Sequence, residues 1–423
     1  MRQPLLLMLL LCLTLGPAVC GRAQESHLEW RAVAEAALAR KDYPAARSAF
    51  LSALDLRPDS ARYLYGLAAT AAAAGDAATA LANLHEMATL GVFAPIAKDP
   101  AFASIQGEAG FRRVLSEFAA NQTPQGEVAT LAELPDQRGI IEGLAYRERT
   151  GDFFFGDVHQ RAIWRRDHTG RIFRFTPEDE ELFGIFGLAL DEARDALWAA
   201  TTALPAMADY RPELKGRAAL AEFELSTGKL RRLVPVPVDG RDHALGDLTV
   251  DDAGTVYATD SLAPIIWQFS PTQEEMEKTI ESPAFYSLQG IVVFQRTLFV
   301  SDYAHGLFTI DLARRTAQPL APPEHATLLG LDGLVAVPGG IAAVQNGLTP
   351  SRVVRIELAP DLKSVTGLTV LAANLPHLED LTLITLVHDR PTFVAGAGWE
   401  GFNPDKQPHP RSHPVWVLQT TLP

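Results

Sequence analysis

The sequence repeats one short pattern six times, and this repetition restricts the fold more than any other feature. The clearest copy, Gln289 to Leu312, reads QGIVVFQRTLFVSDYAHGLFTIDL: a polar residue and a glycine, then three apolar runs separated by turns. The copies begin at residues 142, 186, 246, 289, 332 and 379, at intervals of 43 to 60 residues. Strand repeats near this period are typical of propeller blades. Because one blade cannot bury both faces of its sheet, the pattern predicts a closed ring of six blades.

Two further apolar segments lie outside the six copies, residues 128–134 (VATLAEL) and 415–420 (VWVLQT). We expect them to pair with each other in the sixth blade, because this pairing closes the ring and removes an exposed strand edge. The predicted propeller therefore spans residues 128–423.

An alanine-rich region with helical periodicity precedes the propeller and contains two related units. The first, counted from His27, carries Trp30, Ala34, Ala46, Phe50, Ala53 and Pro58, and the second, from Ala61, carries Leu64, Ala68, Gly75, Ala80 and Leu84. These positions resemble those of the tetratricopeptide repeat, whose period is 34 residues. Since two units are fewer than the three that usually fold alone, we expect the helical segment Phe102 to Phe118 to cap the stack.

The predicted fold class is a multi-domain α plus all-β protein. A small N-terminal helical-repeat region (24–118) leads through a polar linker (119–127) to the six-bladed β-propeller (128–423). Two interpretations of the helices stay open: they form a groove for a protein partner, or they are a packed cap on the propeller.

Residues 1–23 have the form of a secretory signal peptide, with Arg2, an apolar run and small residues at the end. We therefore expect a secreted or periplasmic protein, with a lipoprotein acylated at Cys20 as the alternative. The run is short for a membrane anchor, which needs about 20 apolar residues, so we expect no transmembrane domain. Cys12 and Cys20 are the only cysteines, so the chain after this segment has no thiol for catalysis or metal binding.

Composition and charge exclude several classes of partner and chemistry. The 423 residues are 47% hydrophobic and 21% charged, as in soluble globular proteins. The formal net charge of -14 argues against nucleic acid and anionic membranes, because both need a basic surface. The sequence also lacks the Gly-x-Ser-x-Gly elbow of serine hydrolases and the glycine-rich phosphate loops.

The first residue of each copy begins the innermost strand of its blade, beside the central channel. Four of these residues carry oxygen in the side chain: Glu142, Gln289, Asp332 and Glu379. Like charges in a partly dry site are unfavourable unless paired or protonated, and no Lys or Arg occupies a ring position. One divalent cation (Ca, Mg, Mn or Zn) is the simplest compensation, since such ions bind oxygen ligands. The alternative is that these side chains are solvated or cap neighbouring strands.

The second strand of each blade runs back toward the same mouth of the channel. Four such strands end in a polar residue: Asp157, Asp260, Asp302 and Asn346. We expect the three aspartates to cap the turns that follow. His159 and His305 come two or three residues further on, in loops over the mouth. They are candidates for substrate binding and proton transfer near neutral pH, although a loop histidine is equally compatible with a plain surface position.

At these residues the chain resembles the family of regucalcin (senescence marker protein), gluconolactonase and luciferin-regenerating enzyme, which are six-bladed propellers with one catalytic divalent metal ion in the channel. The resemblance covers residues 128–423. It matches Glu142 to the family's glutamate ligand, Gln289 to its asparagine ligand, and Asp332 to the aspartate that binds the metal and acts as base. Glu379 has no counterpart in the family and could supply a further ligand.

The chain departs from the family at two positions. Gln289 is one methylene longer than the family's asparagine ligand, and Gly246, before Asp247, replaces an asparagine that contacts the substrate.

The resemblance implies a divalent-metal-dependent hydrolase of a lactone or small ester. The metal would polarise the carbonyl group, Asp332 would activate water, and Asp247, His305 and His159 would contact the substrate. The two departures and the attached helices keep a second hypothesis open: a non-catalytic binding or scaffold protein that uses the helical repeat and the propeller as interaction surfaces.

Overall fold

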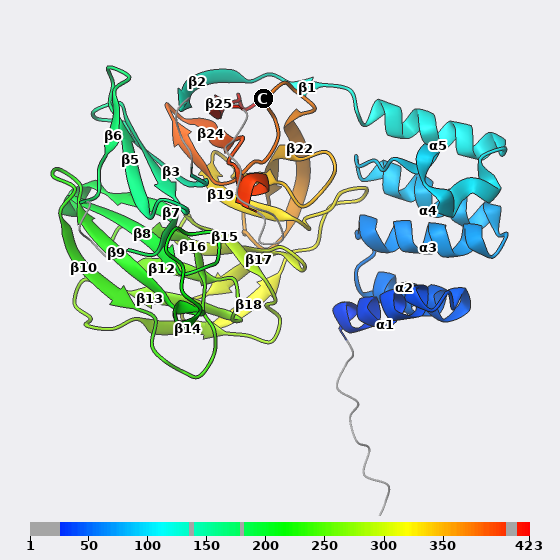
Figure 1. Ribbon diagram of the computed structural model, residues 1–423, viewed down its shortest axis with the longest axis horizontal. Coiled ribbons are helices and arrows are strands. Elements are labelled where there is room, and N and C mark those ends of the chain that lie inside the picture. Colours follow the sequence, from blue (N-terminus) through cyan, green and yellow to red (C-terminus); the bar gives the residue numbers. More distant parts are fainter. Residues whose placement is uncertain (1–25, 135–138, 178–181, 403–412) are drawn as a thin grey trace, which may run out of the picture.

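The computed structural model describes residues 26–134, 139–177, 182–402 and 413–423. The predicted signal peptide (1–23) lies outside these residues. A stack of helices stands beside a ring of β-sheets, and an extended segment joins the two parts (Figure 1). The fold class expected from the sequence is confirmed. Within the described residues, no helix combines the length and the apolar character needed to cross a lipid bilayer.

The ring consists of six antiparallel sheets, one for each predicted blade. The first three blades contain β3 (Ile141–Arg147), β4 (Asp152–Asp157), β5 (Ala162–Arg166) and β6 (Ile172–Arg174); β7 (Gly184–Asp191), β8 (Ala196–Thr202), β9 (Ala218–Glu224) and β10 (Leu230–Pro235); and β11 (Leu245–Val250), β12 (Val256–Asp260), β13 (Ile265–Phe269) and β14 (Glu277–Glu281). The fourth and fifth contain β15 (Leu288–Phe294), β16 (Thr297–Asp302), β17 (Gly306–Asp311) and β18 (Thr316–Pro319); and β19 (Leu331–Val337), β20 (Gly340–Gln345), β21 (Arg352–Leu358) and β22 (Val365–Ala373). The sixth begins with β23 (Ile384–Val387) and β24 (Arg390–Ala395).

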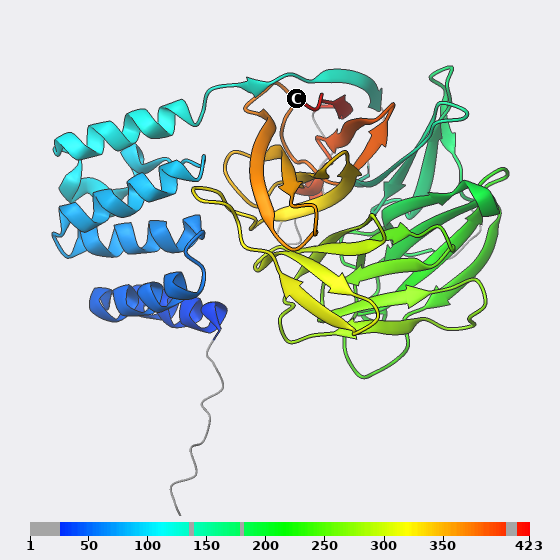
Figure 2. The ribbon, with the colours of Figure 1, turned by 180° about the vertical axis from the view of Figure 1, so that it is seen from behind.

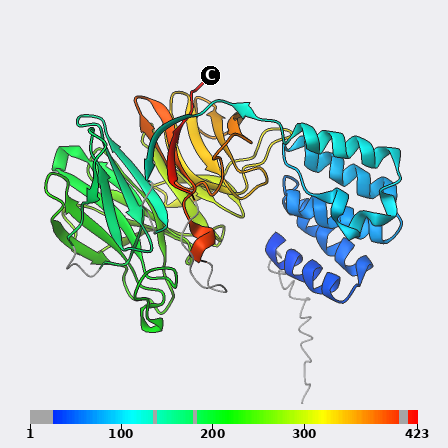
Figure 3. The ribbon, with the colours of Figure 1, turned by 45° about the horizontal axis from the view of Figure 1, so that its top comes forward.

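The sixth blade combines the two ends of the propeller sequence. β2 (Ala129–Leu134) pairs antiparallel with β25 (Val415–Gln419), and β25 pairs in turn with β24. The innermost strands contact one another around the ring, and β23 of the sixth blade contacts β3 of the first. The predicted closure is therefore confirmed, and Figure 3 shows the teal strand β2 beside the red strand β25.

Five of the six innermost strands begin within two residues of the predicted positions, but the sixth does not. β23 begins at Ile384 and not at Glu379. Asp380 has a φ of 48°, in the left-handed region, and its carboxylate accepts hydrogen bonds from the N–H groups of Gly398 and Trp399. These contacts hold the segment after Glu379 in a loop, so the prediction of a strand starting there is wrong.

The glycine that follows the first residue of the pattern has a structural cause. A Cβ added to Gly290 would lie 2.1 Å from the carbonyl oxygen of Asp332, and one added to Gly143 would lie 2.1 Å from that of Phe186. In both cases the obstacle is the backbone of the next blade's innermost strand. Glycine therefore lets the innermost strands approach through their backbones, which gathers the first residues of the copies around one mouth.

Replacing Gly290 by Ala should lower the free energy of unfolding by about 1–3 kcal/mol, because a backbone obstacle cannot move aside as a flexible side chain can. Gly107→Ala is the matched control, since a Cβ added there meets no atom within 4 Å. Thermal melts of both variants measure the effect. Equal melting temperatures for the two variants would contradict the close approach of the strands.

The helices form two consecutive pairs: α1 (His27–Ala39) with α2 (Tyr43–Leu56), and α3 (Ala61–Ala73) with α4 (Ala77–Thr89). The starts of α1 and α3, at 27 and 61, and those of α2 and α4, at 43 and 77, are each one 34-residue period apart. Asp42 and Asp76 occupy equivalent positions and cap α2 and α4 by accepting hydrogen bonds from backbone N–H groups. The period seen in the sequence thus recurs in the helices.

The third helical segment, predicted over Phe102 to Phe118, consists of two pieces. A short 3₁₀ helix (Pro100–Ile105) precedes α5 (Ala109–Ala120). Gly107 lies in the break, where its flexibility disfavours a continuous helix. α5 packs against α4 at the end of the stack.

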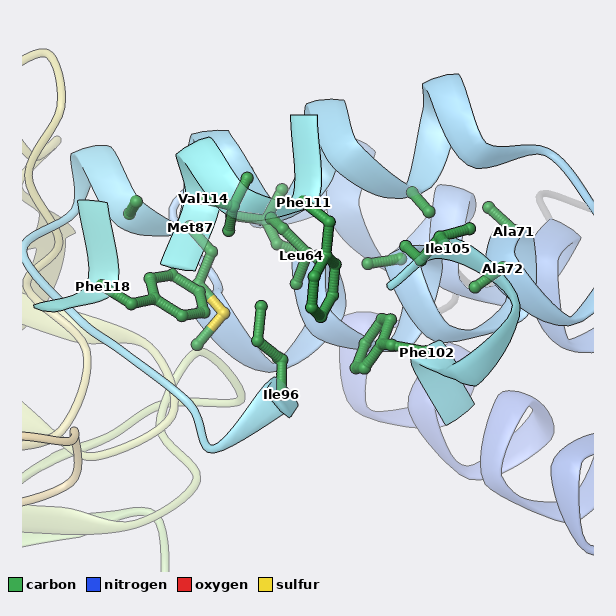
Figure 4. Packing of buried hydrophobic residues seen from close by; sticks show 14 of the residues in the cluster. Leu64, Ala71, Ala72, Met87, Ile96, Phe102, Ile105, Phe111, Val114 and Phe118 are labelled. Carbon is green, nitrogen blue, oxygen red and sulfur yellow. The ribbon is translucent and has the colours of Figure 1, made fainter. Parts of the chain in front are cut away.

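The core of the helical region is shared by α3, α4, the 3₁₀ helix and α5. Figure 4 shows the side chains that meet there, among them Leu64, Met87, Ile96, Phe102, Phe111, Val114 and Phe118. Three aromatic rings, each at most 2% exposed, therefore attach the last segment to the helix pairs by apolar burial.

Hydrogen bonds fix the helices beside one mouth of the propeller. The Arg57 guanidinium, just after α2, donates to the carbonyl oxygen of His305 (2.5 Å) and pairs with Asp59. Asp59 also accepts a hydrogen bond from Thr327 of the propeller (3.0 Å). After α5, β1 (Gln125–Gly126) extends the sheet of the fifth blade next to β22. Figure 2 shows the same arrangement from behind.

Candidate functional site

A channel of 240 Å³ lies between the six innermost strands of the propeller. Each of these strands contributes to its wall, for example through Leu144, Leu188, Leu248, Ile291, Leu334 and Ile384. Asp247 is the one carboxylate among the described residues that line it. Because the wall is mainly apolar, a charge placed beside it is poorly hydrated.

Three carboxylates from different blades lie close together at the start of the innermost strands. Glu142 on β3, Asp247 on β11 and Asp332 on β19 are only 9%, 8% and 8% exposed. Burial raises all three pKa values: that of Asp247 to about 7, that of Asp332 to about 6, and that of Glu142 well above its usual range. The charge of Asp332 raises the pKa values of Glu142 and Asp247 further. The structure thus brings two predicted metal ligands and one predicted substrate contact into one cluster.

No positive side chain compensates this cluster within the described residues. None of their Lys, Arg and His side chains forms an ion pair with Glu142, Asp247 or Asp332. Asp247 accepts backbone hydrogen bonds from Leu248 (2.8 Å) and Ile291 (3.3 Å). These bonds lower the pKa of its carboxyl group but do not overcome the effect of burial.

Asp332 is oriented by a short chain of hydrogen bonds. The Asn346 amide nitrogen, just after β20, donates to Asp332 Oδ2 (2.6 Å) and to the carbonyl oxygen of Leu381 (2.8 Å). The Tyr303 hydroxyl donates to Asn346 Oδ1 (2.9 Å). Burial and the charges of Asp332 and Glu142 raise the pKa of Tyr303 to about 12, so its hydroxyl keeps its proton at neutral pH.

Glu142 is held by a residue that sequence reasoning missed. The indole nitrogen of Trp399, in a short 3₁₀ helix (Trp399–Phe402), donates to Glu142 Oε2 (2.6 Å). The charge of Asp380 also raises the pKa of Glu142. Neither Trp399 nor Asp380 belongs to the repeated pattern at a predicted site position, so the pattern gave no signal for them.

The other two predicted ligands differ in their surroundings. Gln289 lies at the expected place on β15, half-buried, and its amide nitrogen donates to Ser287 Oγ (3.1 Å). Glu379 is exposed and precedes β23, outside the carboxylate cluster, whereas its neighbour Asp380 acts on Glu142. The structure therefore keeps Gln289 at the start of its innermost strand and leaves Glu379 outside the carboxylate cluster.

The two predicted substrate-binding histidines make other contacts. His159 Nδ1 donates to the carbonyl oxygen of Ala206 (2.6 Å), and His305 Nδ1 donates to that of Ala284 (2.7 Å). His305 also packs edge-on against His27 of α1, with ring centres 4.8 Å apart. Both rings are thus held by backbone in loops, apart from the three carboxylates.

The interpretation of the strand-end aspartates as turn caps is confirmed. Asp157, Asp260 and Asp302 are fully buried, and each accepts hydrogen bonds from backbone N–H groups in the turn that follows its strand. These three carboxylates are therefore occupied by structural roles.

A hard divalent cation fits the donor types at the mouth. Among the described residues, no three His, Cys, Asp or Glu side chains are arranged to hold one ion, so acidic ligands alone do not complete a site. Glu142 and Asp332 are close enough for one charge to raise the pKa of the other, and Gln289 lies at the start of the neighbouring innermost strand β15. Two carboxylates and an amide oxygen are donors that such ions accept, with water completing the coordination.

Without a bound cation, the free energy of unfolding should fall as the pH rises from about 4 to about 8. Folding raises the pKa values of Asp247 and Asp332. At a pH between the pKa of the unfolded chain and that of the folded protein, the folded protein therefore binds more protons than the unfolded chain, and its stability falls as the pH rises. The free energy of unfolding should fall by several kcal/mol over this range. Because Asp332→Asn has no charge to bury at this position, the variant should be more stable than wild type at pH 8 but not at pH 4.

Denaturant titrations in a chelating buffer measure this, with Asp361→Asn, an exposed carboxylate, as control. If the free energy of unfolding depends on pH equally in wild type and in Asp332→Asn, ionisation of Asp332 does not destabilise the folded protein.

Fold and site together define a six-bladed propeller with a helical extension and a buried carboxylate cluster at one mouth. No family model matches the sequence, and no curated protein matches it.

Similar solved structures include the PQQ-bound aldose sugar dehydrogenase of Streptomyces coelicolor (16% identity over 70% of this chain and 100% of that chain, TM-score 0.46). They also include a gluconolactonase of Xanthomonas campestris (14%, 69% and 89%, TM-score 0.47) and a luciferin-regenerating enzyme (12%, 71% and 96%, TM-score 0.48). At this level of similarity, the comparisons do not assign an activity.

Proposed function

We propose that the protein is a divalent-metal-dependent hydrolase of a lactone or small ester, and that the carboxylate cluster at the propeller mouth is its active site. One observation carries this proposal: Glu142, Asp247 and Asp332 are buried together with raised pKa values and without a cationic partner among the described residues. A buried set of like charges is unfavourable for stability alone, and strongly perturbed carboxyl groups are typical of functional sites. Of the three, Asp247 also lines the channel.

The ligands that we assign to the cation are Glu142 and Asp332, with the amide oxygen of Gln289. When bound, the cation would polarise the ester carbonyl group and stabilise the negative charge that develops on its oxygen. Trp399 orients the Glu142 carboxylate, and Asn346 with Tyr303 orients that of Asp332.

We assign proton transfer to the two aspartates. Asp332, with a pKa of about 6, is ionised at neutral pH and still basic enough to take a proton from the attacking water. Asp247, with a pKa of about 7, is partly protonated and can give a proton to the alcohol oxygen that leaves. The carbon–oxygen bond of the ester breaks, one water is consumed, and the product is a hydroxy acid or an acid and an alcohol.

Elemental analysis of the purified protein, combined with a hydrolysis screen of aldonolactones and small esters, tests the proposal. We expect about one equivalent of a divalent metal, and hydrolysis that stops in a chelator and returns when the metal is added back. A protein that takes up no divalent metal and hydrolyses none of the screened compounds would favour the non-catalytic binding hypothesis instead.

A further inference from the structure

A second cavity lies between the helices and the propeller. This interdomain cleft has a volume of 530 Å³, which suits a ligand of modest size. Its helical side comes from α1, α3 and the segment after α4, and its propeller side comes from the loops before β15, after β16 and after β20. The hydrogen bonds of Arg57 and Asp59 to the propeller hold its two sides together, so the cleft is formed in advance of any ligand.

The lining of the interdomain cleft is positively charged and aromatic. Two arginines, Arg31 and Arg62, line it, and no Asp or Glu does so among the described residues, although the whole chain has a net charge of -14. Four tyrosines also line it: Tyr63, Tyr65, Tyr286 and Tyr303. Three of the four phenol hydroxyls are hydrogen-bonded within the chain, that of Tyr63 to His27, that of Tyr65 to Asp99 and that of Tyr303 to Asn346. The arginines therefore carry the preference for an anion, and the aromatic rings favour an apolar or aromatic body attached to it.

His27 supplies a buried ring nitrogen without a partner among the described residues. The side chain is 8% exposed, and its Nδ1 lies 2.6 Å from the Tyr63 hydroxyl oxygen. Burial and the nearby His305, Arg57 and Arg31 lower the pKa of His27 to about 4, so the ring is neutral. The Tyr63 hydroxyl has two acceptors within reach, Nδ1 and the carbonyl oxygen of His27 (3.3 Å). In the tautomer in which it donates to Nδ1, the ring proton is on Nε2, which has no partner among the described residues. Such a donor is unfavourable until an acceptor binds to it.

Arg31 also has a buried nitrogen without a hydrogen-bond partner among the described residues. This nitrogen is Nε, and the Glu35 carboxylate lies 3.6 Å away, beyond good hydrogen-bond distance. Glu35 is also 3.6 Å from Arg62, so one carboxylate is shared by two guanidinium groups. About one positive charge is therefore left over, which matches a ligand with a single negative charge.

We propose that the interdomain cleft binds a small organic monocarboxylate with an apolar or aromatic body, whose carboxylate accepts hydrogen bonds from His27 Nε2 and Arg31. The body of the ligand lies among the tyrosines and the apolar residues Met87 and Phe93.

The interdomain cleft is next to the proposed active site. Tyr303 lines the cleft and donates to Asn346, which donates to Asp332. Two hydrogen-bonded residues, Tyr303 and Asn346, therefore connect a ligand in the cleft to the carboxylate cluster. The substrate preference rests on the proposed function. Because the cleft adjoins the active site, the preferred substrate is an ester or lactone that carries a carboxylate on an apolar body.

Calorimetric titration with 4-phenylbutyrate and octanoate, in a chelating buffer at low salt, tests the proposal on the full chain. The neutral amide 4-phenylbutyramide is the matched ligand. We expect both carboxylates to bind, the amide to bind at least about tenfold more weakly, and added salt to weaken only the carboxylates. If neither carboxylate binds at millimolar concentration, or if the amide binds equally well, the proposal is wrong.

Variants locate the site. The double variant Arg31→Gln and Arg62→Gln should weaken 4-phenylbutyrate binding about tenfold or more, and His27→Phe, which keeps a ring but removes the donor, should weaken it severalfold. Arg113→Gln is the control, because this exposed arginine of α5 makes the same kind of pair with a glutamate four residues away, outside the cleft. Melting curves check that each variant is folded. Unchanged binding in the folded double variant would place the ligand elsewhere.

The binding test is independent of the metal site. Asp332→Asn should bind 4-phenylbutyrate as wild type does in the chelating buffer, even if it hydrolyses nothing. If 4-phenylbutyrate binds but no ester is hydrolysed, the proposed function is wrong and the anion site stands. If neutral esters are hydrolysed but no carboxylate binds, the anion site is wrong and the proposed function stands.

Discussion

Asp332→Asn should remove the divalent cation and lower the rate of lactone or ester hydrolysis by about 10²- to 10⁴-fold, the contribution of a well-placed general base. The substitution keeps the shape of the side chain, so Asn346 can still donate to it, but the variant can neither balance a cation nor take a proton from water. Metal content after dialysis and initial rates on the best compound of the screen measure the two effects.

Two controls define what the result means. Asp361→Asn removes an exposed carboxylate elsewhere on the propeller and should change neither metal content nor rate. Glu142→Gln should lose the metal as Asp332→Asn does, because both residues belong to the same buried cluster. Hydrolysis at the wild-type rate in Asp332→Asn would refute its assignment as ligand and base.

Removal of residues 415–423 should unfold the propeller or lower its melting temperature by more than any single substitution. β25 lies between β24 and β2, and Val415, Trp416, Val417 and Leu418 are at most 7% exposed. Burial of such side chains contributes about 1.5–3 kcal/mol each, so their loss approaches the stability of a typical domain, about 5–15 kcal/mol. Thermal melts and circular dichroism measure the loss.

A shorter truncation is the control. Removal of residues 421–423 leaves β25 and the hydrogen bond of Thr420 to the carbonyl oxygen of Glu127 in place, so the melting temperature should fall only slightly. A melting temperature unchanged by the longer deletion would mean that β2 can close the ring without β25.

The sequence predicted the ring well because the pattern has physical causes that recur from blade to blade. In four copies a glycine follows the first residue, at 143, 187, 290 and 333, where the next blade leaves no room for a Cβ. The third copy has Asp247 at this position, and the sixth has Asp380, which turns the backbone into the left-handed region. A pattern defined by strands could not anticipate a loop fixed by a side chain, which is why the start of β23 was placed too early.

The site was predicted only where it lies on the pattern. Glu142, Asp332 and Asp247 are strand residues, so their gathering follows from the closure of the ring. Trp399 and Tyr303 come from loops, whose paths depend on tertiary contacts and not on a period. The interdomain cleft exists only because the helices are held in one orientation relative to the propeller. Single contacts, such as that of Arg57 with His305, set this orientation. No spacing in the sequence encodes that contact.

The pairing of β2 with β25 also has a consequence for biosynthesis. β2 ends at residue 134 and its partner begins at residue 415, so during translation this apolar strand is made early and waits for almost the whole propeller before it is covered. Until then the nascent ring has an open seam with an unpaired strand, the kind of surface that chaperones recognise and that aggregates when neighbouring ribosomes are crowded. Slow synthesis of the last blade would therefore reduce the yield of folded protein even though no contact in the finished molecule is altered.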